Sequence, residues 1–420
     1  MANKVIQCRR VVITGIGMVT PIGIGIEENW KNVVAGVSGA DTFASEKLAQ
    51  FPVHFGCEVK NFDATKWIEP REARRLDRFV HFAVAASRLA KEDAGLELDK
   101  LNPKRCGAIY ASGIGGILSV EEQLVKFTQK GPSRISPFSV PLLMINAACG
   151  QIAMDMGFRG LNYATVTACS SSNHAIGVAF RHIQIGDADL LMTGGTEAGI
   201  GIMGLGGFAN MHALSTRNDD PKKASRPFDK DRDGFVIGEG AGTLVLEELE
   251  HAKARGAKIY AEIVGYGFTD DATHITAPDS TGEGLADAMH LALDMGGVNI
   301  DQVGYINAHG TSTKLNDLME TNAVKRAFGD ELARKVSISS TKSCTGHMLG
   351  ATGAVELGYT ALAVKNGVIP PTINYETPDP ECDLDYTPNT ARERNIEYAM
   401  SSNCGFGGHN AVILIGKYKG

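Results

Sequence analysis

The sequence predicts an α/β protein made of two similar halves. Its β-branched and apolar runs lack polar alternation, which is typical of strands that helices cover on both faces. Residues 9–23 (RRVVITGIGMVTPIG) and 259–272 (IYAEIVGYGFTDDA) each carry such a run into a Gly-X-Gly triplet, and the triplets lie 250 residues apart. A pattern that returns in this way indicates a duplicated unit. We expect each strand to end at its triplet.

A second pair of segments repeats in the same order. Residues 164–195 and 336–374 each predict a strand, a small polar turn, a helix, a glycine-containing turn and another strand. Between the repeats, a short helix stops at Gly256 and a new strand follows. We therefore predict an N-terminal half over residues 1–255 and a C-terminal half over residues 256–420.

Composition narrows the class of protein. The chain has 420 residues, 43% hydrophobic residues and a net charge of −7, which argues against a general binder of nucleic acid or membrane surfaces. No apolar run is long enough to cross a bilayer. The N-terminus carries no secretory signal, so we expect a cytoplasmic protein, or a plastid-type stroma if a transit peptide has been removed. The polar segment 215–235 predicts a long surface excursion.

The eight cysteines form no C-x-x-C pair, so no metal site is expected and most thiols should be reduced packing residues. Cys169 is the exception. It lies where the strand of the first repeat turns into its helix, and the helix N-terminus should favour a thiolate and lower the thiol pKa. A buried structural cysteine is the alternative, and for any single cysteine it is the more common one.

Three further side chains occupy related places. His309 ends an apolar strand, where α/β proteins bind ligands. Lys342 and His347 lie in the turn that mirrors the Cys169 turn. If the duplication places the two turns face to face, one thiol, two imidazoles and one ammonium converge. The alternatives are a turn histidine and a structural Lys342–Glu356 salt bridge. The glycines of residues 405–408 could bring free N–H groups to the same place as an oxyanion hole.

The motifs TACSSS, NAHGTST, TKSCTGHMLGATGAVE and NCGFGGHN, in this order, resemble the elongating β-ketoacyl-[acyl-carrier-protein] synthases of types I and II, with type II preferred. The resemblance covers essentially the whole chain. It implies the thiolase fold, a duplicated five-layered α-β-α-β-α sandwich, usually as a homodimer. It also implies a cytoplasmic acyltransferase of fatty acid synthesis that uses no cofactor other than the phosphopantetheine carried by its substrates.

The resemblance implies a role for each site residue. Cys169 would accept the acyl chain from acyl-carrier protein, and His309 and His347 would support decarboxylation of malonyl-carrier protein, giving a 3-oxoacyl product two carbons longer and carbon dioxide. Lys342 would set the local charge. The remaining implied residues are the oxyanion-hole N–H groups of Cys169 and Phe406, the supporting Glu356, Thr311 and Thr313 at the pantetheine arm, and Ile114, Phe208 and Phe406 around the acyl chain.

Four arginines, Arg71, Arg74, Arg75 and Arg78, have the spacing of one helix face. The resemblance implies that Arg71, Arg74 and Arg75 dock the acidic carrier, although a charge run is more often only a solvated face. The chain departs from common family patterns at Cys404 (often Phe), His409 (often Thr) and Lys314 (often Pro), and we interpret Cys404 as a packing residue.

Three other functions stay open at this point. The first is a non-catalytic partner like the chain-length factors, which lack the active cysteine. The second is a specialised condensing enzyme, such as an iterative polyketide synthase, that uses the same pocket. The third is a carrier-binding scaffold in which the motif residues serve only packing. The acyl-chain length is not readable from the sequence, because it depends on pocket depth.

Overall fold

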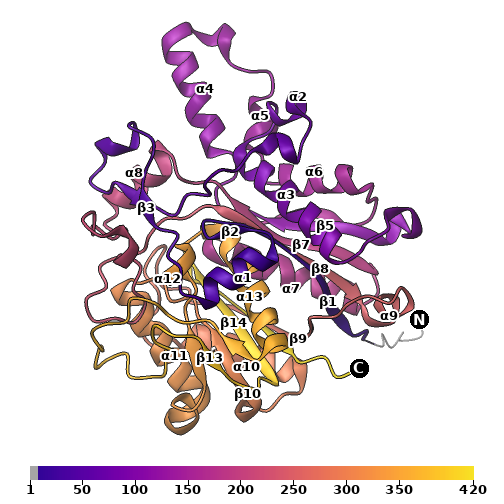
Figure 1. Ribbon diagram of the computed structural model, residues 1–420, viewed down its shortest axis with the longest axis vertical. Coiled ribbons are helices and arrows are strands. Elements are labelled where there is room, and N and C mark those ends of the chain that lie inside the picture. Colours follow the sequence, from indigo (N-terminus) through magenta and orange to yellow (C-terminus); the bar gives the residue numbers. More distant parts are fainter. Residues whose placement is uncertain (1–7) are drawn as a thin grey trace.

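The computed structural model describes residues 8–420, and its strands form a single continuous mixed sheet with two small additional ribbons (Figure 1). The strands are β1 (Val11–Thr20), β2 (Gly23–Ile24), β3 (Asp41–Thr42), β4 (Phe55–Gly56), β5 (Cys106–Ala111), β6 (Asn162–Thr165), β7 (Leu190–Glu197), β8 (Gly240–Glu248), β9 (Ala261–Asp270), β10 (Val303–Asn307), β11 (Ser337–Ser339), β12 (Val368–Ile369), β13 (Arg392–Glu393), β14 (Tyr398–Gly405) and β15 (His409–Gly416).

The helices connect and cover these strands. They are α1 (Ile26–Val34), α2 (Pro70–Ala73), α3 (Arg78–Asp93), α4 (Ile117–Lys130), α5 (Ser139–Leu143), α6 (Ala147–Met156), α7 (Ser171–Gln184), α8 (Ile202–Asn210), α9 (Leu249–Ala254), α10 (Glu283–Gly296), α11 (Lys314–Ala333), α12 (Lys342–Thr345) and α13 (Thr352–Asn366). No helix in the described part of the chain is long and apolar enough to span a membrane.

The sheet has the same topology in both halves. Its order is β6-β5-β7-β8-β1 in the first half and β11-β10-β14-β15-β9 in the second. In each half the first three strands of this order are parallel to one another, and each of the last two pairs antiparallel with the strand before it. The halves join where residues 11–13 of β1 pair with residues 261–263 of β9. The duplication predicted from the sequence is therefore present in the fold.

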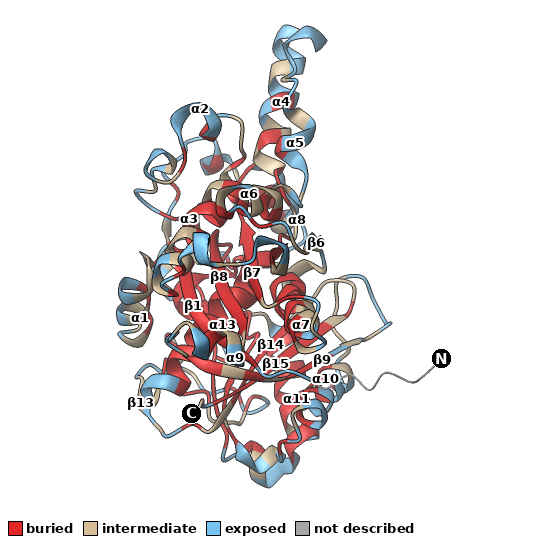
Figure 2. Cartoon of the chain, turned by 90° about the vertical axis from the view of Figure 1, so that its right-hand side faces the viewer, coloured by how far each residue is buried: buried red, intermediate tan, exposed pale blue. Residues whose placement is uncertain are grey.

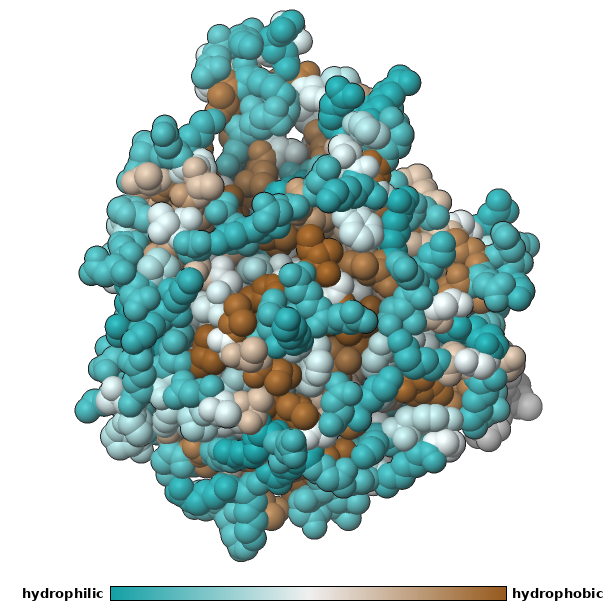
Figure 3. All heavy atoms as spheres, in the orientation of Figure 1, coloured by the Kyte–Doolittle hydropathy of each residue, from teal (hydrophilic) through white to brown (hydrophobic). Residues whose placement is uncertain are grey.

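Three hydrophobic cores stack the elements into five layers. One core packs α3 and α6 on the outer face of the first half-sheet. A central core packs α7 and α13 between the two half-sheets. A third packs α10 and α11 on the outer face of the second. The predicted α-β-α-β-α sandwich is confirmed, with its buried residues concentrated on the strands and on α7 and α13 (Figure 2). The outer shell in Figure 3 is mostly hydrophilic, and hydrophobic side chains show mainly in recesses.

The two Gly-X-Gly triplets lie inside their strands, so the prediction that the strands end there was wrong. A Cβ on Gly17 would lie 1.9 Å from the Ala86 carbonyl oxygen, and one on Gly267 would lie 1.9 Å from the Ala288 carbonyl oxygen. These glycines let α3 and α10 pack directly against β1 and β9. Close helix approach, rather than a turn, explains the glycines.

Residues 215–235 form only in part the surface excursion that their polarity predicts, because residues 216–223 are exposed or half-buried and much of the rest is buried. Residues 224–229 and 234–235 are buried, as are the side chains of Arg226, Asp229 and Arg232. The charges are paired within the protein, with Arg226 2.9 Å from Asp229 and Arg232 2.6 Å from Asp379. Mutual pairing allows charged residues to be buried. The division of the chain at residues 255 and 256 stays a prediction.

Candidate functional site

Cys169 lies in a single 3₁₀ turn, Ala168–Ser170, between β6 and α7. The neighbouring serines shape this turn. The Ser171 hydroxyl donates to the Ala168 carbonyl at 2.6 Å, and Ser170 Oγ lies 3.0 Å from the Asn403 carbonyl oxygen. The turn is thus fixed both internally and to the loop before the glycine-rich segment of the other half.

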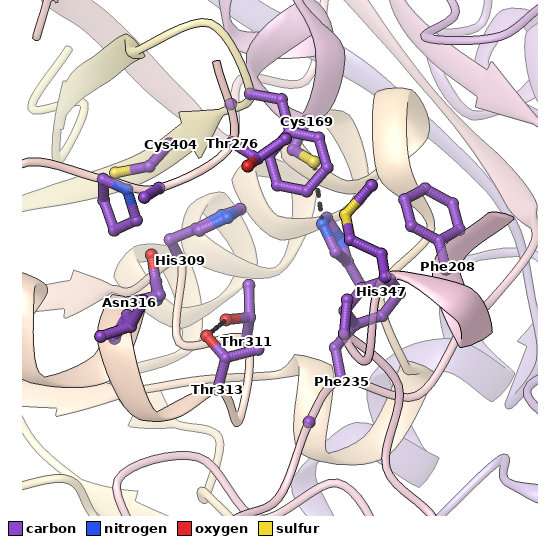
Figure 4. Close-up of a pocket in the computed structure, with 18 of the residues that line it drawn as sticks. Cys169, Phe208, Phe235, Thr276, His309, Thr311, Thr313, Asn316, His347 and Cys404 are labelled. Carbon is purple, nitrogen blue, oxygen red and sulfur yellow. Dashed lines mark hydrogen bonds between the residues drawn. The ribbon is translucent and has the colours of Figure 1, made fainter. Parts of the chain in front are cut away.

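A cavity of about 390 Å³ opens above this turn. Figure 4 shows Cys169, His309 and His347 facing its interior, with Cys404 on one side and Phe208 on the other. The side chains come from both halves of the chain, as the facing-turn argument predicts. Its lining includes Cys169, Phe208, Phe235, Asp271, Thr276, His309, Thr311, Thr313, Lys314, Asn316, His347, Leu349, Cys404 and Phe406.

His347 is the immediate neighbour of the thiol. Its Nε2 lies 3.0 Å from Cys169 Sγ, and its Nδ1 lies 3.1 Å from the Thr352 hydroxyl oxygen. The His309 ring stands edge-on to the His347 ring, with 5.3 Å between centroids. Since a hydroxyl can donate or accept, Thr352 is compatible with a proton on either nitrogen of His347.

A hydrogen-bonded chain fixes the orientation of His309. Lys342 Nζ donates to Glu356 at 2.6 Å, and the Asn403 amide nitrogen donates to the other Glu356 oxygen at 2.8 Å. The same amide nitrogen lies 3.3 Å from His309 Nδ1. Because that amide nitrogen can only donate, His309 Nδ1 accepts and its Nε2 carries the proton. Asn403 was not singled out from the sequence; its place directly before the glycine-rich loop is the signal that could have found it.

Both imidazoles are held neutral. Burial, and then the Lys342 charge, lower the pKa of His347 well below its ordinary value, and burial, Lys342 and His347 do the same for the pKa of His309. A buried cation nearby makes a second positive charge unfavourable. A neutral imidazole keeps one N–H group, so each of the two rings can still donate a hydrogen bond.

The expected lowering of the thiol pKa was wrong. Burial raises the pKa of Cys169 to about 12, although Lys342 and the N–H groups of Phe406 and of Cys169 itself act in the opposite direction. The sulfur is exposed only to the cavity, and desolvation outweighs the helix terminus. The two N–H groups lie close enough to the Cys169 sulfur to favour a negative charge there, and their role as an oxyanion hole stays a prediction.

The other predicted pocket residues separate into two groups. Thr311 and Thr313 line the cavity, with 2.9 Å between their hydroxyl oxygens, and Phe208 and Phe406 line it as well. Ile114 does not line it. The Ile114 side chain, like that of Leu349, lies next to Gly199, and Ile114 lines a neighbouring open cavity instead.

The arginines do not share one helix. Helix α2 ends at Ala73 and α3 begins at Arg78, because the Asp77 side chain caps α3. Arg78 is held by Glu239, whereas Arg71 and Arg74 are exposed. Arg75 is half-buried, paired with Glu72 and placed over the Phe138 ring. The three residues predicted to dock the carrier therefore remain accessible, whereas Arg78 is engaged by Glu239 and does not belong to their surface.

Two of the three departures from the family pattern, Cys404 and Lys314, line the cavity, and His409 does not. Cys404 packs against the third core, as interpreted, and its side chain also lines the cavity. Lys314 is exposed at the cavity edge, and His409 Nδ1 lies 3.3 Å from Asp270. All eight thiols are free, and among residues 8–420 no three His, Cys, Asp or Glu side chains are grouped as metal ligands.

Comparison with known proteins agrees with this arrangement. The N-terminal domain of beta-ketoacyl synthases matches residues 8–252, and their C-terminal domain matches residues 260–376. The 3-oxoacyl-[acyl-carrier-protein] synthase 2 of Staphylococcus aureus (strain COL) is 50% identical over 98% of this chain and 99% of its own. The enzyme of the same name from Synechocystis sp. (strain ATCC 27184 / PCC 6803 / Kazusa) is 49% identical over 100% of both chains.

Solved structures show the same likeness. A beta-ketoacyl synthase from Burkholderia phymatum STM815 has a TM-score of 0.91 and 36% identity, covering 98% of this chain and 100% of its own. A chain of a type II polyketide ketosynthase complexed with its acyl-carrier protein has a TM-score of 0.92 and 35% identity, with the same coverage. The chain therefore belongs to the beta-ketoacyl synthase family, as a condensing acyltransferase of the elongating type II.

Proposed function

We propose that this enzyme condenses an acyl chain carried on Cys169 with malonyl-carrier protein, and that its Cys169, His309 and His347 perform the reaction. One observation carries the proposal: the thiol and both imidazoles face a single cavity, and the N–H groups of Cys169 and Phe406 act on the sulfur. These groups supply the nucleophile, the proton acceptor and the hydrogen-bond donors that the reaction needs. No cofactor beyond the carrier's phosphopantetheine is required.

In the first half-reaction, Cys169 Sγ attacks the thioester carbonyl of the acyl-carrier protein. The thiol proton passes to His347 Nε2, which lies 3.0 Å away. The oxyanion accepts hydrogen bonds from the N–H groups of Cys169 and Phe406. The C–S bond to the carrier breaks, and the departing thiolate takes the proton back from His347. The acyl chain is then held as a thioester on Cys169.

In the second half-reaction, the malonyl thioester oxygen lies against the two Nε2–H groups. His309 is already in that form through Asn403, and His347 adopts it by moving its proton from Nδ1 to Nε2, after which Nδ1 accepts from the Thr352 hydroxyl. Both donors stabilise the enolate as the carboxylate carbon–carbon bond breaks and carbon dioxide leaves. The enolate carbon attacks the acyl-Cys169 carbonyl, the Cys169 thiolate departs and takes up one proton from solvent, and the 3-oxoacyl thioester is released on the carrier.

The carrier protein is the proposed macromolecular partner. The ketosynthase of one similar structure is bound to an acyl-carrier protein, and here Arg71 and Arg74 are exposed cations that an acidic carrier can meet. Thr311 and Thr313 would contact the pantetheine arm, and Phe208 and Phe406 the acyl chain. A non-catalytic chain-length factor fits less well, because the nucleophile and its imidazole partner are both in place. The bacterial relatives support a cytoplasmic location.

Two variants separate the half-reactions. With acyl-carrier protein, intact-mass spectrometry should find one acyl group on the wild type and on His309→Asn, and none on Cys169→Ala. Condensation should be lost in both variants, by about 10² to 10³ in His309→Asn, the usual cost of one oxyanion donor. An acyl adduct on Cys169→Ala, or full condensation by His309→Asn, would contradict the proposal.

We propose a homodimer formed across β6. This strand is an unpaired sheet edge and is exposed, whereas its counterpart β11 is buried under the loop of Asp385, whose carbonyl accepts from Ile338 at 2.8 Å. An exposed edge is a ready pairing site. Exposed apolar side chains surround it; this β6 patch comprises Val140, Leu143, Met144, Met154, Tyr163 and Val166.

Sedimentation velocity tests the dimer. The wild type should sediment at twice the chain mass, and the double variant Met154→Lys/Tyr163→Lys should shift toward the monomer, because it would bury unpaired charges at the interface. Leu291→Lys, on the outer helix α10, is the matched control and should remain dimeric. A monomeric wild type would rule out the dimer.

A further inference from the structure

The largely buried segment 224–235 contacts the turn of Lys342–His347 and the turn of Thr311–Lys314. The Ser225 hydroxyl donates to the Lys342 carbonyl at 2.8 Å, and the Phe235 ring stands edge-on to His347 with 5.3 Å between centroids. Its charged side chains are divided: Arg226, Asp229 and Arg232 are buried, whereas Lys230, Asp231 and Asp233 are exposed.

The Thr311–Lys314 turn is strained and held from outside. Ser312 has φ 69°, in the left-handed region that favours glycine. Its carbonyl accepts from the Gly234 N–H at 3.1 Å, and its hydroxyl oxygen accepts from the Arg226 N–H at 3.0 Å. Such a conformation persists where the surroundings impose it. Here the surroundings are the segment 224–235.

Arg232 completes the support. Its Nε donates to the Thr313 carbonyl at 3.2 Å and one Nη to the Lys314 carbonyl at 3.1 Å. Its other Nη donates to the Asp229 carbonyl at 2.8 Å and to Asp379 at 2.6 Å. The side chain is 4% exposed. One planar guanidinium therefore joins an acidic anchor to two successive carbonyls, a geometry that the point charge of lysine cannot reproduce.

We propose that Arg232 is a positioning residue for the thioester arm of the carrier. Its guanidinium fixes the backbone on which Thr311 and Thr313 present paired hydroxyls to the cavity (Figure 4). Arg232 does not line the cavity, so it acts through that turn. The inference rests on the proposed contact of the two threonines with the pantetheine arm.

Arg232→Lys tests the proposal. The KM for acyl-carrier protein in the acylation of Cys169 should rise about tenfold, the effect of one lost charge-assisted hydrogen bond. The maximal acylation rate and the alkylation of Cys169 by iodoacetamide should stay within about twofold, because a saturating carrier concentration offsets weaker binding of the arm and iodoacetamide does not use the arm. Arg255→Lys is the matched control. Arg255 also forks onto a buried carboxylate, Glu247, and donates to the Ala94 carbonyl, away from the cavity.

Two further variants keep the test decisive. Ser312→Gly relieves the strain and removes one anchor without touching a charge, and its KM should also rise; if Arg232→Lys does not fold, a wild-type KM in Ser312→Gly overturns the proposal.

Thr311→Val/Thr313→Val probes the proposed function itself. A raised KM there with an unchanged KM in folded Arg232→Lys refutes the positioning role alone. An unchanged KM in the threonine variant refutes the pantetheine contact. An equal rise in Arg255→Lys would show a general effect of stability and would also overturn the proposal.

Discussion

Cys169 differs from the other cysteines by its neighbours and not by its acidity. Burial raises the pKa of Cys344 to about 12, just as it does for Cys169. Among the thiols of residues 8–420, only Cys169 is hydrogen-bonded to an imidazole. Reactivity in such a site comes from proton transfer within the complex with substrate.

This leads to a pH prediction for the free enzyme. Because the thiol pKa is raised to about 12, the thiolate fraction is small at neutral pH and grows as the pH rises. The rate of Cys169 alkylation by iodoacetamide should therefore increase by about tenfold per pH unit from pH 7 to 10. Mass spectrometry of the labelled residue follows the rate, with Cys169→Ala as the control. A plateau between pH 7 and 8.5 would instead indicate a lowered thiol pKa.

At the scale of residues, the sequence predicted which reactive side chains meet, but not the burial and the neighbours that set their properties. Repeated turns were enough to predict that Cys169, His309 and His347 converge, since topology alone brings them together. The thiol pKa was predicted in the wrong direction because burial depends on residues distant in the chain. Asn403 was missed because an asparagine has no titration or nucleophilicity that marks it in a sequence.

At the scale of elements, strand and helix types were predictable and their ends were not. The two Gly-X-Gly triplets look like turn signals, yet α3 and α10 need them inside β1 and β9. The arginine spacing of residues 71–78 fits one helix face, yet the Asp77 cap starts a new helix there. At the glycines a tertiary contact overrides the local pattern, and at the arginines a local helix cap does.

The broken arginine face still supports a docking prediction. Reversing three charges, Arg71→Glu/Arg74→Glu/Arg75→Glu, should raise the KM for acyl-carrier protein about tenfold or more and make it less sensitive to salt, because each exposed cation helps to capture an acidic partner. Cys169 alkylation should be unchanged. The matched control is Arg326→Glu/Arg334→Glu/Lys335→Glu, with one residue inside α11 and two directly after it, far from α2 in Figures 1 and 2. Equal carrier kinetics in the two triple variants would reject the docking face.

At the scale of the whole molecule, the duplication predicted the five layers because each repeat supplies one half-sheet and one central helix. It could not predict the cavity, whose volume depends on how Phe208, Leu349 and Phe406 pack. Nor could it show that Arg232 is buried, since the carboxylates that pair with its charge, Asp317 and Asp379, lie far along the chain.

The shared central core predicts that the halves unfold together. Val355 of α13 belongs to the second half but packs in the core that contains α7 and β1 of the first. Val355→Ala should cost about 2 kcal/mol of stability, the price of two buried methyl groups. Both tryptophans, Trp30 and Trp67, lie in the first half.

In Val355→Ala, the urea midpoint followed by tryptophan fluorescence should nevertheless fall by the same amount as the midpoint followed by circular dichroism of the whole chain. Both are measured at one fixed protein concentration, because a dimer would make the midpoint concentration-dependent. Val37→Ala, the same change at a valine that is 41% exposed, should leave the midpoint nearly unmoved. A tryptophan transition that stays at the wild-type midpoint in Val355→Ala would show that the two halves are separate folding units. A common shift means that Cys169 and the two histidines, which come from different halves, lose their geometry in a single step.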